Sequence, residues 1–85
     1  MFESVENGDE VRIQYISSRS NNFVNRNGEV IQKPSKNKNT LFIRSGEKQL
    51  TGIKSGKVYS VTIDDGLKNV GRNTYIGKFD SITKI

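Results

Sequence analysis

The sequence predicts an all-β fold, a small barrel of five to seven short antiparallel strands, on three observations. The apolar residues are dominated by seven Val and nine Ile with no Ala, which favours strands over helices. Apolar and polar residues alternate with a period of two in several segments. Turn-forming residues recur about every ten residues, which is typical of small barrels. Because 85 residues suffice for one domain and no helical segment is evident, residues 1–85 are expected to form a single barrel.

The first three strands are expected at residues 10–17, 23–32 and 40–44. In the first, Val11, Ile13 and Tyr15 share one face. In the second, the apolar pattern lapses over residues 25–28, and Gly28 indicates a bulge, a bend or a reversal. In the third, Leu41 and its alternate neighbour Ile43 point inward if Phe42 and Arg44 point outward.

The remaining strands are expected at residues 50–53 and 58–64, with one or two closing strands after the Asp64-Asp65-Gly66 turn. A further turn is expected at Ser55-Gly56. In the strand at 58–64, Tyr59 and its alternate neighbours are expected on the core side and Val58 on the other. The predicted inward set is Val11, Ile13, Leu41, Ile43, Val61 and Ile63, helped by Val30, Ile53, Ile76 and Ile82.

Two residue types are missing, and their absence restricts the chemistry. Without Cys there is no disulfide framework, thiolate nucleophile or cysteine-ligated metal. Without His the commonest general base and neutral metal ligand are lost. Asp64 and Asp65 fit a hairpin turn better than a metal or acid/base pair, because adjacent carboxylates on a strand point to opposite sides. We therefore expect no enzyme, no catalytic residue, no metal site and no cofactor.

The positive charge is concentrated in one part of the chain. Residues 1–10 carry four acidic groups and no basic one, whereas residues 11–60 hold ten Lys or Arg against two Glu. This distribution is typical of a protein that binds a polyanion. The acidic start is unlike a secretory signal, and no apolar run approaches the about 20 residues of a membrane span. We expect no membrane association and a cytoplasmic or nucleoid location.

The segment Gly8–Ile13, followed by Gly28-Glu29-Val30, resembles the KOW-type opening of SH3-like barrels found in ribosomal proteins and transcription elongation factors. In those families a Gly-Asp turn leads into an alternating strand, and a second Gly precedes another apolar strand. The resemblance covers residues 8–31. It implies a five-stranded SH3-like barrel that often contacts RNA or protein.

The candidate nucleic-acid-binding residues are cations and aromatics in loops and on strand faces. Arginines held on strands are expected to contact phosphates with more fixed geometry than loop lysines. Phe42 shares a face with Arg44 and would form a base-stacking platform, unless Phe42 belongs to the core. The full set is Arg12, Arg19, Arg26, Lys33, Lys36, Lys38, Phe42, Arg44, Arg72 and Tyr75.

Two functions remain open from the sequence. The first is a nucleic-acid-binding barrel, for DNA or RNA, that contacts the phosphate backbone in an accessory or architectural role. The second is a protein-interaction or virion-assembly module without nucleic-acid contact, which pairs through an open strand edge, forms homo-oligomers or uses its basic surface to bind an acidic protein. The sequence does not fix the oligomeric state.

Overall fold

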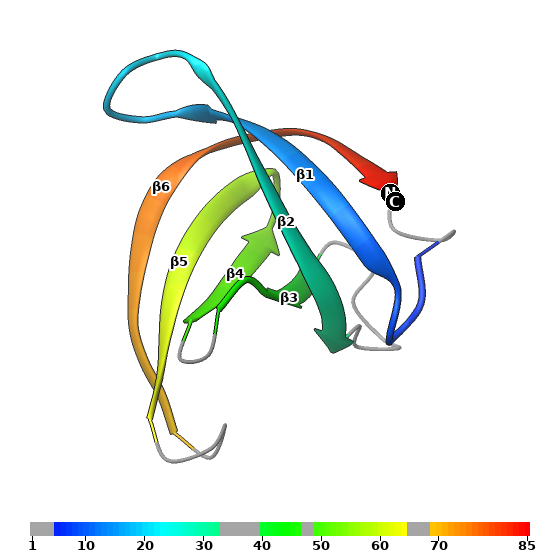
Figure 1. Cartoon of the computed structure of the whole chain (residues 1–85). Coiled ribbons are helices and arrows are strands. Elements are labelled where there is room, and N and C mark those ends of the chain that lie inside the picture. The colour runs from blue at the N-terminus through cyan, green and yellow to red at the C-terminus, as the bar shows by residue number, and fades with distance from the viewer. Residues whose placement is uncertain (1–4, 33–39, 47–48, 65–68) are drawn as a thin grey trace.

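The computed structural model of the chain describes residues 5–32, 40–46, 49–64 and 69–85. Within these ranges six strands form one sheet (Figure 1): β1 (Glu10–Ser17), β2 (Phe23–Gln32), β3 (Thr40–Arg44), β4 (Gln49–Lys54), β5 (Lys57–Asp64) and β6 (Asn69–Lys84). Each strand pairs antiparallel with the next, and β6 pairs with β1 to close a barrel. The predicted fold class, an all-β small SH3-like barrel of five to seven antiparallel strands, is confirmed. No helix that could cross a membrane occurs among the described residues.

The strand β2 is continuous from Phe23 to Gln32, so the interruption predicted over residues 25–28 is wrong. Its pairing with β1 runs in register from Ile16↔Phe23 to Glu10↔Glu29. Gly28 serves close packing there, because a Cβ atom at this position would lie 2.6 Å from the carbonyl oxygen of Arg44 on β3. Only glycine lets the two backbones approach this closely.

The main core fills the barrel interior. Alternation on β1 and β3 places side chains inward as predicted, and Val5, ahead of β1, packs against them. The buried members are Val5, Val11, Ile13, Tyr15, Val30, Leu41, Ile43, Ile53 and Val58, with Val24, Ile76, Phe79 and Ile82 partly buried against them. The side chain of Ile63, also predicted inward, lies outside the described part of the chain.

The inward face predicted for β5 is wrong. Val58 is fully buried in the main core. Val61 is buried as predicted, but it belongs with Leu50 to a second, smaller apolar cluster, against which Ile31, Phe42 and Tyr59 pack partly buried. The two-residue turn at Ser55 and Gly56 sets this arrangement, because it pairs Ile53 with Val58 across the hairpin. Paired residues share a face of the sheet, so Val58 follows Ile53 into the interior and its neighbour Tyr59 points out.

The strand β6 bridges two partners along its 16 residues. Its first half pairs with β5, where the register shifts twice, and its second half pairs with β1, where the register shifts once. One bulge falls at Ile76, between the pairs Tyr59↔Tyr75 and Val58↔Gly77. A bulge adds twist and bends the strand, which lets one long strand curve around to close the barrel (Figure 1).

Candidate nucleic-acid interface

Three lysines lie side by side on the outer face of neighbouring strands, and we call them the lysine row. Lys54 on β4 is paired directly with Lys57 on β5, and Lys57 is paired directly with Lys78 on β6. All three side chains are exposed, and none forms an ion pair with another described residue. Like charges directly opposite each other destabilise a sheet, so this arrangement has an energetic cost in the free protein.

A row of aromatic residues crosses the same outer face beside the lysine row. Gly52 and Tyr59 lie two positions from Lys54 and Lys57 on their strands, and Tyr75 lies three positions from Lys78 because of the bulge at Ile76. Phe42 on β3 pairs with Gly52 on β4, Gly52 pairs with Tyr59 on β5, and Tyr59 pairs with Tyr75 on β6. We call Phe42, Tyr59 and Tyr75 the aromatic row. The rings of the two tyrosines meet edge to face, with centroids 5.9 Å apart and planes at 66°. Tyr75 is 46% exposed, and the other two rings are partly buried.

A hollow of about 250 Å³ lies in the outer face between Phe42 and Tyr59. Gly52 forms part of its floor, and the lysine row begins at its rim with Lys54. The described residues that line it are Thr40, Phe42, Gly52, Ile53, Lys54, Tyr59, Val61 and Asn73. The hollow therefore combines two aromatic walls with an adjacent positive charge.

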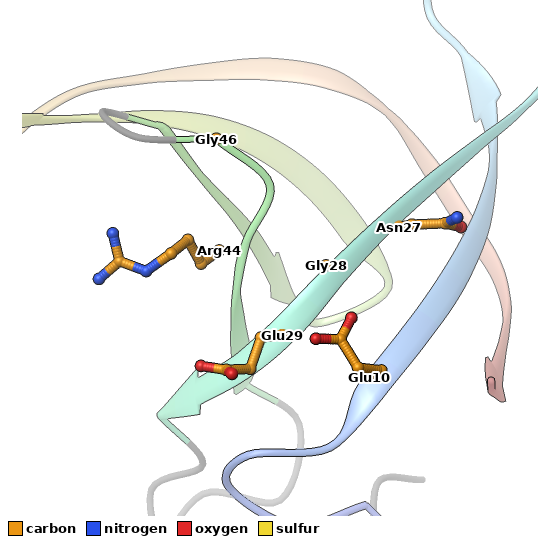
Figure 2. Close-up of a pocket in the computed structure, with 6 residues that line it drawn as sticks. All are labelled: Glu10, Asn27, Gly28, Glu29, Arg44 and Gly46. Carbon is orange, nitrogen blue, oxygen red and sulfur yellow. The ribbon is translucent and has the colours of Figure 1, made fainter.

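Arg44 lies on the same outer face but beside two carboxylates. It pairs across the sheet with Glu29, which in turn pairs with Glu10 on β1. Figure 2 shows the two glutamates on neighbouring strands and the guanidinium of Arg44 pointing away from both. These three residues line an open depression of about 540 Å³. The two carboxylates would repel a phosphate backbone, which makes this part of the surface a poor site for a polyanion.

Arg12 and Arg19 occupy different places. The Nε–H of Arg12, an exposed side chain on β1, donates a hydrogen bond to the Oδ1 atom of Asn27 on β2 at 3.0 Å, away from the aromatic row. Arg19 lies in the turn between β1 and β2, where it lines a hollow of about 410 Å³ together with Tyr75. The structure thus brings Arg19 to the end of the aromatic row, which the sequence separation of the two residues did not indicate.

Arg26, expected to contact phosphate from a strand face, points inward from β2. It pairs with the core residue Ile13 and shares its inward face. Its Nη1 atom donates to the hydroxyl of Thr51 at 3.3 Å, and its guanidinium lies 6.0 Å from the ring centroid of Tyr15. Its guanidinium is therefore engaged by residues on the inward face, and the side chain is partly buried.

Four predicted contacts cannot be placed in the interface. Lys33, Lys36 and Lys38 lie outside the described residues, as does the side chain of Arg72, whose backbone belongs to β6. Among the residues that the structure describes, no group of three or more acidic side chains comes together to hold a metal ion. The described part of the interface therefore lies on strand faces.

Sequence reasoning missed the lysine row and Tyr59. The signal was available in part, because a two-residue turn at Ser55-Gly56 requires its flanking residues Lys54 and Lys57 to face each other. The third lysine depends on the register between β5 and β6, which a bulge alters, and no local pattern specifies it.

Comparison of the chain with protein-family profiles, with curated proteins and with solved structures found no match. The resemblance to KOW-type barrels therefore stays a prediction. Its two segments do lie against each other, since the amide of Gly8 donates to the carbonyl of Val30 at 2.7 Å and the amide of Val30 donates to the carbonyl of Asp9 at 2.9 Å. The function has to be argued from the chemistry of the outer face.

Proposed function

We propose that this protein binds nucleic acid on the outer face of β3 to β6, in an accessory or architectural role. The lysine row contacts the phosphate backbone, and the aromatic row beside it contacts bases. The observation that carries the proposal is the direct pairing of Lys54 with Lys57 and of Lys57 with Lys78. A bound polyanion offsets the repulsion among these three lysines. Polyanion binding therefore explains why they lie side by side despite the cost in the free protein.

The dimensions of the row suit a phosphate backbone. Neighbouring strands lie about 4.8 Å apart, so the three lysines span roughly 10 Å of surface. Their flexible side chains reach several consecutive phosphates as point charges. Contacts of this kind give affinity without sequence preference, because phosphates carry no sequence information.

The aromatic row favours nucleic acid over an acidic protein as the partner. The carboxylates of an acidic peptide would be attracted by the lysines but would make no specific contact with the three aromatic rings beside them. Bases stack on such rings, and every base has a face that can do so. The closed barrel also pairs both edges of β1, which weakens the case for binding through an open edge of that strand.

The experiment is fluorescence anisotropy with single- and double-stranded DNA and RNA across a salt series. If the three lysines each release one counterion, the logarithm of affinity should fall against the logarithm of salt with a slope of about −2 on single strands. Lys57→Gln should reduce that slope by about 0.7. The matched control is Lys84→Gln, which removes the same charge at a site where the amine pairs with Asp9 at 3.3 Å and lies outside the row.

Two results would count against the proposal. One is the absence of any polynucleotide that binds more tightly than about 100 μM at low salt, which is the weak limit of non-specific binding. The other is an equal loss of binding in the Lys57→Gln and Lys84→Gln variants. The first result would leave an acidic protein as the partner of the lysine row, and the second would show that polynucleotide binding does not depend on the row.

A further inference from the structure

We propose that the hollow above Gly52 holds one unpaired base, so that the interface selects single-stranded over double-stranded nucleic acid. This inference rests on the proposed function and names the form of its ligand. In a duplex the faces of the bases are covered by their neighbours, whereas an unstacked base in a single strand can turn toward an aromatic surface.

The glycine at the floor of the hollow is the first support. Gly52 lies in the interior of β4, where glycine weakens a strand and often marks a place that another group approaches closely. Its backbone does not need glycine, since its φ is not among the positive values of the chain. Crowding is the reason, because a Cβ atom here would lie 3.1 Å from the Cε1 atom of Phe42 and 3.6 Å from a methyl carbon of Val61. The absence of a Cβ atom therefore lets the ring of Phe42 lie close to β4 and form one wall of the hollow.

The walls and the size of the hollow are the second support. Phe42 and Tyr59 stand on either side of Gly52 on the neighbouring strands. The volume of about 250 Å³ is below the roughly 300–1,000 Å³ of pockets for drug-sized ligands. It suits a small planar group such as one base.

The charges around the hollow are the third support. Lys54 lines the hollow and also begins the lysine row, so a base in the hollow places its own phosphate beside the cations. The exposed Asn73 lines the opposite side and offers an amide that can donate to or accept from a base edge. An apolar ligand would gain nothing from these neighbours.

A simpler explanation is that Gly52 only makes room for the ring of Phe42. In that case the protein would bind the phosphate backbone and ignore the bases. The two explanations differ in one measurable quantity, the gain in affinity that a base provides over a bare sugar-phosphate chain.

The test compares a short oligothymidylate with an abasic sugar-phosphate oligomer of the same length, by anisotropy at fixed low salt. The wild-type protein should bind the oligothymidylate about 5- to 150-fold more tightly, the range for one base–aromatic stack. Equal and measurable affinity for both would overturn the base-binding hollow and the base contacts of the aromatic row, and would leave only the phosphate contacts of the lysine row from the proposed function. Failure of both probes to bind would overturn the proposed function itself.

Substitutions in the hollow test whether the preference for oligothymidylate arises there. Gly52→Ala narrows the hollow without changing charge and should bring the affinity for oligothymidylate close to that for the abasic oligomer. Gly46→Ala is the matched control, because a Cβ atom there would meet only Gln49 at an ordinary 3.9 Å. If circular dichroism shows that Gly52→Ala is unfolded, Phe42→Leu tests the same wall. A preference for thymidylate that survives the folded variant would refute the inference.

Discussion

At the scale of single residues, Thr51 and Arg26 hold together two strands that do not pair. Thr51 on β4 is the one polar residue among the fully buried side chains that the structure describes. Its hydroxyl accepts from Arg26 on β2 and shares a hydrogen bond of 3.0 Å with the hydroxyl of Ser45. The pairing of β2 with β3 covers only residues 29–32 of β2, so this network links β2 to β4 beyond that contact.

Arg26→Ala should therefore reduce stability and leave binding unchanged. Loss of the hydrogen bond and of the contact with Tyr15 predicts a decrease of about 1–3 kcal/mol in the free energy of unfolding. Urea denaturation measures this decrease. The control is Arg12→Ala, a change at an exposed site that should cost no more than about 0.5 kcal/mol. Equal costs at the two positions would show that Arg26 is not anchored inside the barrel.

At the scale of elements, the hairpin of β4 and β5 builds the interface. Its two turn residues both have positive φ, 53° at Ser55 and 77° at Gly56, as a two-residue hairpin turn of type I′ requires. The turn fixes Lys54 opposite Lys57 and Gly52 opposite Tyr59. One turn thus sets the first pair of the lysine row and the position of Gly52 opposite Tyr59.

Replacing the turn glycine tests this dependence. Gly56→Ala should lower the free energy of unfolding by about 1–2 kcal/mol, because a side chain is disfavoured in the left-handed region. No atom lies within 4 Å of a Cβ atom at this position, so crowding does not contribute. In thermal or urea unfolding, Gly46→Ala should cause a much smaller decrease in the free energy of unfolding, since Gly46 is not among the glycines with positive φ. A neutral Gly56→Ala would mean that the hairpin does not depend on this turn.

The strands could be predicted from local pattern, whereas the interface depends on register between strands. Alternation in β1 and β3 identified Val11, Ile13, Leu41 and Ile43 as inward because each strand has one clearly apolar face. In β5 alternation favoured the face of Tyr59 and its alternate neighbours, because that face carries more apolar residues, whereas the hairpin register places Val58 inside. Arg26 was misplaced for a related reason, since a charged residue is expected outside unless a buried partner such as Thr51 is known.

At the scale of the whole molecule, charge is divided over the outer surface. The lysine row lies across β4, β5 and β6, whereas the paired carboxylates of Glu10 and Glu29 lie across β1 and β2. A polyanion is attracted to one part of the barrel and repelled from another, which orients it on the surface. Function of this kind conflicts with stability, because the charges that attract the ligand repel one another in its absence.

Lys57→Glu separates the effect of the lysine row on stability from its effect on binding. A carboxylate at the centre of the row would face Lys54 and Lys78, which replaces two repulsive pairs by two attractive ones. Each cross-strand pair contributes about 0.2–1 kcal/mol, so urea denaturation at low salt should show a variant more stable by roughly 0.5–1.5 kcal/mol. The gain should shrink at about 1 M salt, where screening acts over about 3 Å. In anisotropy the same variant should bind polynucleotides more weakly than Lys57→Gln does. A variant that is no more stable than the wild type at low salt would show that the lysines do not repel one another in the free protein, and the main support for a polyanion site would be lost.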